Sequence, residues 1–164
     1  RHADRVKIAC LAQVVNVIAP IMTVSGGPAW KQTIYYPFLH ASTYGRGILL
    51  HGVAESPRYD TKQYTDVPAL EQVAIYHEEA GEVTIFALNR GTEEMLLSCR
   101  LSDFGRLMPI GHTVLSGYDL TAANTLDTPN LVEPHEVAPP VADGNSFDVK
   151  LDALSWNVIR VKIG

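Results

Sequence analysis

The chain has 164 residues, of which 46% are hydrophobic and 19% charged, and its formal net charge is −5. These proportions are ordinary for a soluble globular protein and argue against a chain that is disordered throughout. A negative net charge without any run of Lys or Arg argues against nucleic acid and an anionic membrane surface as partners. No stretch approaches the roughly 18 consecutive apolar residues of a membrane-spanning helix.

The most informative stretch lies near the N-terminus. Nearly every residue from Val6 to Ile18 is apolar, and the two interior exceptions are the amides Gln13 and Asn16. An apolar run without alternation predicts a strand at about Val6–Gln13 that is buried on both faces, as in a parallel sheet. Because a buried amide is costly unless it is hydrogen-bonded, Gln13 and Asn16 need either a structural partner or a ligand.

The next segment is predicted to be a loop ending at Pro28, followed by a helix over Ala29–Tyr44. Apolar residues such as Ile34 and Phe38 recur there at helical spacing, so one face should pack inward. Pro37 should kink the helix by removing a backbone hydrogen bond. One strand and one helix form a single β/α unit, which cannot close a parallel sheet alone.

After residue 47 the pattern changes to short strands separated by turn signals. Ala69–Tyr76 and Glu82–Asn89 are predicted to form a hairpin. A series of such strands is typical of an antiparallel β-sandwich. The other strands are predicted at Ile48–Val53, Glu94–Leu101, Met108–Leu115, Asn145–Leu151 and Asn157–Ile163.

The segment from Asp119 to Pro140 is rich in Pro, Asn and Asp, and predicts a long loop with one short strand at Leu131–Pro134. Asp60 and Asp66 fall in another long polar loop. They could contact a carbohydrate, but an ordinary polar surface explains them equally well.

Cysteine and histidine usage gives no sign of a disulfide framework or a metal site. Cys10 lies inside the apolar run and is interpreted as a small buried side chain, and nothing implies a disulfide with Cys99. A reducing, cytoplasmic compartment fits this usage. The histidines lack the spacing of metal ligands, so no metal and no cofactor are predicted.

Two regions of the sequence carry motifs that are informative when taken together. The first region runs from Asp4-Arg-Val-Lys-Ile-Ala-Cys-Leu-Ala-Gln13 through Val15-Asn16-Val-Ile-Ala-Pro20, Gly26-Gly27-Pro28-Ala-Trp30 and Tyr36-Pro37-Phe38 to Tyr44-Gly45-Arg46-Gly47. The second comprises Tyr59-Asp60-Thr61, Asp66-Val67-Pro68, Phe86-Ala87-Leu88-Asn89-Arg90, Ala123-Asn124-Thr125 and Leu154-Ser155-Trp156-Asn157-Val158-Ile159-Arg160. Together these regions closely resemble the C-terminal part of the α-L-arabinofuranosidases of glycoside hydrolase family 51.

The resemblance implies a (β/α)8 barrel followed by a β-sandwich of jelly-roll type. Residues 1–47 would supply the last strand and helix of the barrel, and residues 48–164 the sandwich. The sugar-binding glutamine of the family matches Gln13, near the C-terminal end of that strand, where barrel active sites lie. Asn16 and Trp30 would help to shape the pocket, although a loop cap explains Asn16 and core packing explains Trp30 equally simply.

A retaining glycosidase needs two carboxyl groups about 5–5.5 Å apart. No Asp or Glu lies between Asp4 and Glu55, so residues 1–47 cannot supply this pair, and the family places both glutamates on earlier strands. We therefore expect no catalytic residue in this chain and no activity from the chain alone. A companion chain would carry the remaining barrel strands and both glutamates.

The expected function is that of the C-terminal chain of a retaining exo-α-L-arabinofuranosidase. Its substrates would be terminal arabinofuranosyl groups of arabinan, arabinoxylan or arabino-oligosaccharides, and the whole enzyme would be a homo-oligomer. The alternative is a non-catalytic carbohydrate-binding β-sandwich. Binding platforms usually expose several aromatic rings, whereas Trp156 is the sole tryptophan in the predicted sandwich.

Overall fold

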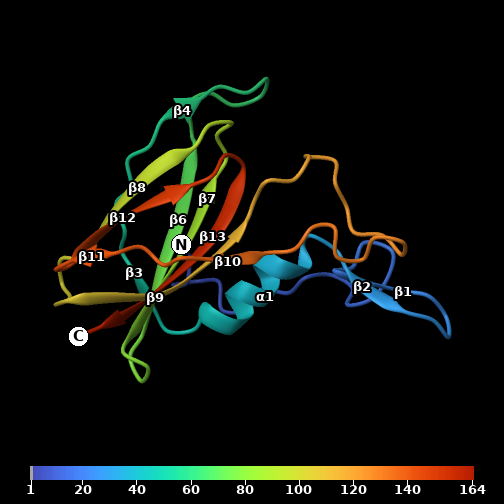
Figure 1. Cartoon of the computed structure of the whole chain (residues 1–164), viewed down its shortest axis with the longest axis horizontal. Helices are drawn as coiled ribbons and strands as arrows, with labels where there is room; N and C mark the ends of the chain where they lie inside the picture. Colours follow the sequence, from blue (N-terminus) through green and yellow to red (C-terminus); the bar gives the residue numbers. More distant parts are fainter. Residues whose placement is uncertain (1) are drawn as a thin grey trace. The chain divides into compact units, whose positions relative to one another are not determined.

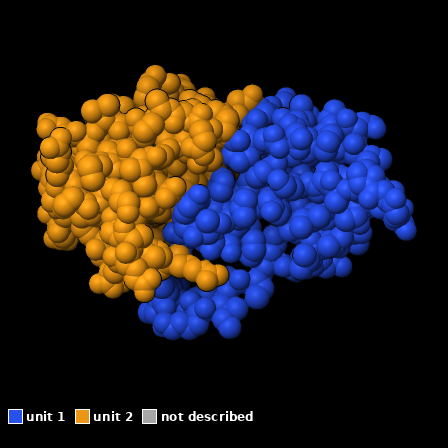
Figure 2. All heavy atoms as spheres, turned by 60° about the horizontal axis from the view of Figure 1, so that its bottom comes forward, with its two compact units in different colours: residues 1–45, 118–134 blue, residues 46–117, 135–164 orange. Residues whose placement is uncertain are grey.

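The computed structural model describes residues 2–164, which form the strands β1 to β13 and the helix α1 (Figure 1). They divide into two compact units, coloured separately in Figure 2. The first unit comprises the chain up to Gly45 together with Tyr118–Pro134, and the second comprises Arg46–Gly117 with His135–Gly164. Each unit is described by itself below.

The second unit is a sandwich of two antiparallel sheets with the strand orders β10-β9-β13-β7-β6-β3 and β11-β12-β8. The larger sheet contains β3 (Ile48–Leu50), β6 (Leu70–His77), β7 (Glu82–Asn89), β9 (Leu107–Leu115), β10 (His135–Val137) and β13 (Ser155–Ile163). The smaller contains β8 (Met95–Arg100), β11 (Ala142–Asp143) and β12 (Ser146–Leu151). This architecture confirms the predicted antiparallel β-sandwich.

The core of the sandwich lies between its two sheets. Alternate residues of β7 and β13 point inward from the larger sheet, and alternate residues of β12 meet them from the smaller one. Completely burying one such aliphatic side chain contributes about 1.5–3 kcal/mol. The members of this core with no exposed surface are Val83, Ala87, Leu151, Ile159 and Val161.

The opposite face of β7 is also buried, at Thr84 and Phe86. The rings of Phe86 and Trp156 stack with their centroids 5.7 Å apart. Farther along the same pair of strands, the Arg160 guanidinium donates to both carboxylate oxygens of Glu82, at 2.6 and 3.0 Å. These contacts join β7 to β13 independently of the core between the sheets.

The first unit begins with a hairpin of β1 (Ile21–Thr23) and β2 (Ala29–Lys31), which turns at Gly26 with a φ of +67°. Helix α1 then covers Tyr35–Tyr44. The predicted helix over Ala29–Tyr44 is therefore wrong in its first part, because residues 29–31 pair with β1 instead.

The predictions for the helix interior also need correction. Pro37 lies in the first turn of α1, where a backbone N–H has no partner within the helix, so its ring interrupts no hydrogen bond. The buried residues of α1 are Tyr36 and His40. Ile34 and Phe38, predicted to face inward, are 48% and 45% exposed.

The predicted strand over Val6–Gln13 is not formed. Among residues 2–164 nothing pairs with this segment, and Ile8 is 83% exposed. Cys10, predicted to be buried, is exposed as well. A two-faced apolar strand is stable only between neighbouring strands, and the described residues provide none.

The segment between β9 and β10 also differs from the prediction. The short strand expected at Leu131–Pro134 occurs instead at His135–Val137, where β10 pairs with β9. Residues 118–134 before it belong to the first unit rather than to the sandwich. The division into a barrel piece over residues 1–47 and a sandwich over 48–164 stays a prediction.

Candidate functional site

The turn that follows the apolar N-terminal segment carries two of the predicted sugar-binding residues. Gln13, Asn16 and Val17 have φ values of 53°, 62° and 60°. This left-handed conformation is uncommon outside glycine and especially unfavourable for a β-branched residue such as Val17. Each such residue costs of the order of 1–3 kcal/mol, and strain of this kind gathers at ligand-binding segments.

Gln13 presents an exposed side chain, and its amide makes no hydrogen bond within residues 2–164. Its donors and acceptor are therefore available to a ligand. The structural alternative, a core amide satisfied by the protein, does not describe Gln13 in this chain. Sugar contact at Gln13 stays a prediction.

Asn16 is engaged within the protein. Its amide nitrogen donates to the Thr23 hydroxyl at 2.9 Å, and its amide oxygen accepts from the Thr23 backbone N–H at 2.7 Å. The backbone N–H of Asn16 also donates to the Ile21 carbonyl at 2.8 Å. Asn16 thus ties the turn to β1, which matches the structural alternative for this residue.

Trp30 lies half-buried on β2, and its indole N–H donates to the backbone carbonyl of Asn124 at 3.2 Å. The Gln32 amide donates to the same carbonyl at 3.1 Å. Trp30 is thus engaged within the protein by a hydrogen bond, and a role for it in shaping a sugar pocket stays a prediction.

Asn124 is the residue of this region that the sequence did not single out by its chemistry. It is 2% exposed, and its amide nitrogen donates to the carbonyls of Lys31 and Val132, each at 2.9 Å. Its amide oxygen accepts from the Val132 N–H at 2.7 Å. In the sequence, an asparagine in a Pro- and Asp-rich loop looks like an ordinary turn residue, so no local signal marks it as buried.

A second set of contacts holds the same segment, here at its C-terminal end. The Tyr118 hydroxyl donates to the Glu133 carbonyl at 2.7 Å, and the Tyr36 hydroxyl lies 3.5 Å from the Glu133 carboxylate. Burial, followed by the nearby Glu133 charge, raises the pKa of Tyr36 above its ordinary value. Tyr36 therefore stays protonated at neutral pH and acts as a hydrogen-bond donor.

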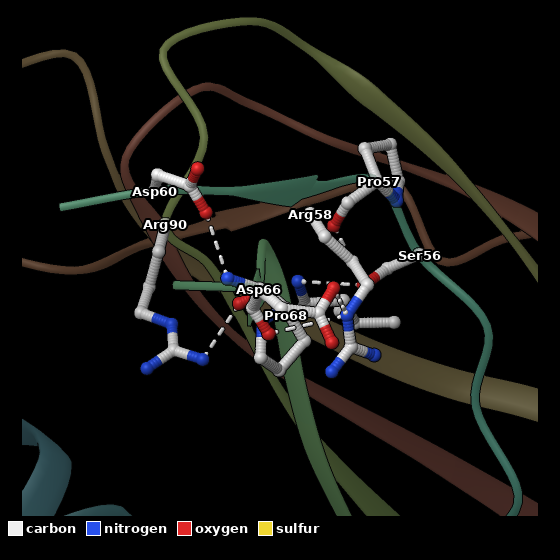
Figure 3. Close-up of polar contacts among 8 residues, drawn as sticks. Ser56, Pro57, Arg58, Asp60, Asp66, Pro68 and Arg90 are labelled. Atoms are coloured by element: carbon white, nitrogen blue, oxygen red, sulfur yellow. Dashed lines mark hydrogen bonds and ion pairs between the residues drawn. The ribbon is translucent and has the colours of Figure 1, made fainter. Parts of the chain in front are cut away.

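The hairpin of β4 (Arg58–Tyr59) and β5 (Val67–Pro68) contains Asp60 and Asp66, shown in Figure 3. Asp60 accepts from the backbone N–H of Asp66 at 2.8 Å, and Arg58 pairs with the Asp66 carboxylate at 2.5 Å. Arg90 donates to the Pro68 carbonyl at 2.7 Å. Both carboxylates are engaged in holding the hairpin, which favours the structural interpretation over carbohydrate contact.

A buried polar cluster lies within the sandwich. Asn89 donates to the carbonyls of Glu93 and Asp152, at 2.9 and 2.8 Å, and is completely buried. His112 is 2.9 Å from the side-chain oxygen of Asn157. Burial lowers the pKa of His112, while the hydrogen bond to Asn157 opposes that shift. Each of these side chains has a hydrogen-bond partner within the sandwich, so we interpret them as structural.

Comparison with known proteins identifies the fold. The sequence model of the α-L-arabinofuranosidase C-terminal domain matches residues 1–155. A solved family 51 α-L-arabinofuranosidase from Bifidobacterium longum superposes with a TM-score of 0.89 at 35% identity, covering 97% of this chain and 31% of that one. The chain belongs to the α-L-arabinofuranosidase C-terminal domain family, as the C-terminal part of a family 51 enzyme.

Two curated relatives share more of their sequence with this chain. A protein of Halalkalibacterium halodurans, called an intracellular exo-α-(1→5)-L-arabinofuranosidase, is 51% identical over 162 residues, which are 98% of this chain and 32% of the relative. A similarly named protein of Bacillus subtilis is 46% identical, over 99% of this chain and 32% of the relative. The chain thus spans about a third of the length of the curated relatives that it matches.

Proposed function

We propose that the chain completes a retaining exo-α-L-arabinofuranosidase that releases terminal arabinofuranosyl groups from arabinan, arabinoxylan or arabino-oligosaccharides. Residues 1–47 would add the last strand and helix to a (β/α)8 barrel, and Gln13 would hydrogen-bond a hydroxyl of the bound sugar. Asn16 and Trp30 would hold the surrounding turn and hairpin. Both catalytic glutamates would come from the part of the relatives that has no counterpart in this chain.

One observation carries the proposal: an exposed apolar segment leads directly into an unpaired amide. Val6 and Ile8 are 54% and 83% exposed, and Gln13 follows them with an amide that makes no hydrogen bond among residues 2–164. Exposed apolar surface of this kind is typical of an interface. Inserting the segment between barrel strands would bury both of its faces. Gln13 would then lie at the end of a barrel strand, where active sites of such barrels are found.

The first unit exposes further apolar side chains on α1. Phe38 and Leu39 are 45% and 41% exposed, although the helix is anchored through Tyr36. In a barrel, a helix packs against the strands and against neighbouring helices. In the complete enzyme, Phe38 and Leu39 would pack against the neighbouring helices.

The surroundings of the enzyme follow from its relatives. The H. halodurans and B. subtilis proteins are named intracellular, and we propose a cytoplasmic location and a homo-oligomeric whole enzyme. None of the helices in the described part of the chain is long and apolar enough to cross a membrane. The companion region and arabinofuranosyl oligosaccharides would be its partners.

A chimaera tests the proposal. The matched third of the H. halodurans relative is replaced by this chain, and hydrolysis of an aryl α-L-arabinofuranoside is measured beside the unmodified relative. We expect activity from the chimaera and none from the chain alone. Gln13→Ala in the chimaera should raise KM, because one hydrogen bond to the sugar is lost. An inactive but folded chimaera would contradict the proposed function.

A further inference from the structure

We propose that Asn124 is a positioning residue for the sugar site: it fixes the hairpin β1–β2 and, through Asn16, the turn that presents Gln13. The inference rests on the proposed function, since it deepens the account of the same site. It assigns a task to the long segment 118–134, which interrupts the sequence of the sandwich yet belongs to the first unit.

Asn124 attaches segment 118–134 to β2. The side-chain amide of Asn124 donates to the Lys31 carbonyl at 2.9 Å. The backbone carbonyl of Asn124 accepts from the Trp30 indole and the Gln32 amide, at 3.2 and 3.1 Å. Asn124 is 2% exposed. Only the bond to Lys31 uses the Asn124 side chain. Removing that side chain therefore leaves the Lys31 carbonyl without this donor at a site that water does not reach, while the backbone carbonyl of Asn124 keeps its bonds from Trp30 and Gln32.

Asn124 is also held within its own segment, by Val132. Its amide oxygen accepts from the Val132 N–H at 2.7 Å, and its amide nitrogen donates to the Val132 carbonyl at 2.9 Å. The amide thus bonds both backbone groups of Val132 while reaching β2. An alanine would remove the side-chain bonds to Lys31 and to Val132 together, which loosens the link between the segment and β2.

Strand β2 is connected to the turn at Gln13 through β1 and Asn16. Strand β2 pairs with β1 over Thr23↔Ala29, Met22↔Trp30 and Ile21↔Lys31. Both the side chain and the backbone of Asn16 bond to β1, through Thr23 and Ile21. Gln13 lies three residues before Asn16, and both hold left-handed backbone conformations. Such conformations persist only when the surrounding structure holds them, so a loosened hairpin should release the turn.

The experiment uses the chimaera. Asn124→Ala is expected to raise KM for the arabinofuranoside about tenfold, with kcat nearly unchanged, because sugar binding depends on a hydrogen-bonding group held in place. Asn124→Asp keeps the side-chain volume and should act like Asn124→Ala, since a carboxylate oxygen would face two carbonyls. The control is Asp127→Ala, an exposed side chain of similar size in the same segment, which should leave KM unchanged.

Coupling to Gln13 separates positioning from a general structural role. If Asn124 acts through Gln13, the double variant Gln13→Ala with Asn124→Ala should be no worse than Gln13→Ala alone. The indole resonances of Trp30 and Trp156 provide a readout without sugar: Asn124→Ala should shift the first and leave the second in place.

The outcomes distinguish the two claims. A shifted Trp30 resonance with unchanged KM would mean that Asn124 is only structural and would overturn the inference. Additive effects in the double variant would overturn it too. A Gln13→Ala variant with normal KM would instead contradict the sugar contact in the proposed function, and with it the route through Gln13.

Discussion

The two units use similar apolar residues in opposite ways. In the sandwich, Leu151 and Ile159 have no exposed surface, whereas Ile8 and Val17 in the first unit are 83% and 79% exposed. The sandwich contains two sheets that cover each other. The first unit contains one short hairpin and one helix. The sandwich therefore supplies its own core, while the N-terminal segment finds no cover within residues 2–164.

The same substitution in each unit gives the largest expected contrast. Ile159→Ala should lower the free energy of unfolding of the sandwich by about 3–4 kcal/mol, because it leaves a cavity between two sheets. Ile8→Ala, at an exposed position, should change it by less than about 0.5 kcal/mol. Urea denaturation followed by circular dichroism measures both. Equal losses in the two variants would contradict the contrast between a buried Ile159 and an exposed Ile8.

Two buried asparagines test whether each unit depends on its own amide. Asn89→Ala should destabilise the sandwich by about 2 kcal/mol, because buried carbonyls lose their donor. Asn124→Ala should leave the sandwich transition unchanged, since its bonds lie in the first unit. Thermal unfolding reports the first effect, and hydrogen exchange of the β2 amides reports the second. A lowered sandwich melting temperature in Asn124→Ala would contradict the division.

The smallest effect concerns pH. Burial lowers the pKa of His112 below its ordinary value, so folding favours the neutral ring. The stabilisation is complete above the unfolded pKa of about 6.5 and is lost as pH falls from there through the folded pKa. Urea denaturation at several pH values between 5 and 7 gives the slope of the free energy of unfolding against pH. This slope should be smaller in His112→Gln and unchanged in the exposed control His51→Gln. Identical slopes in both variants would argue against a neutral buried His112.

The sequence predicts the sandwich well because its signals are local. In β7, alternation of Val83, Ile85 and Ala87 with Thr84 and Phe86 indicates a strand covered on both sides, and the structure buries all five. The hairpin turn between β6 and β7 follows from Gly81. Such patterns need no knowledge of distant residues.

The first unit is harder to predict because its structure depends on contacts between residues that are distant in the sequence. Apolar spacing over Ala29–Tyr44 fits a helix, but pairing with β1 takes residues 29–31 into a strand. Val6–Gln13 has the composition of a buried strand, yet residues 2–164 offer no strand beside it, and the segment forms none. The buried amide of Asn124 bonds the Lys31 carbonyl, which is 93 residues away in the sequence. Local patterns carry none of this information.

The prediction for Gln13 has two parts, and only the first follows from the local sequence. That an amide in the apolar run needs a partner follows from its chemistry. That the partner is a sugar rests on the family resemblance. The Gln13 amide, exposed and without a hydrogen bond in the described part of the chain, fits that role.

The most direct test of the central claim compares the two cysteines with a thiol-alkylating reagent, in the chain alone and in the chimaera. Burial raises the pKa of the Cys99 thiol to about 12, so Cys99 should react slowly in both proteins, because the thiolate is the reactive form. Cys10 is exposed in the chain and should be alkylated quickly there. Once its segment is inserted as a barrel strand, Cys10 should become strongly protected, as peptide mass spectrometry would show. Equally fast alkylation of Cys10 in a folded chimaera would contradict the claim that this segment completes the barrel.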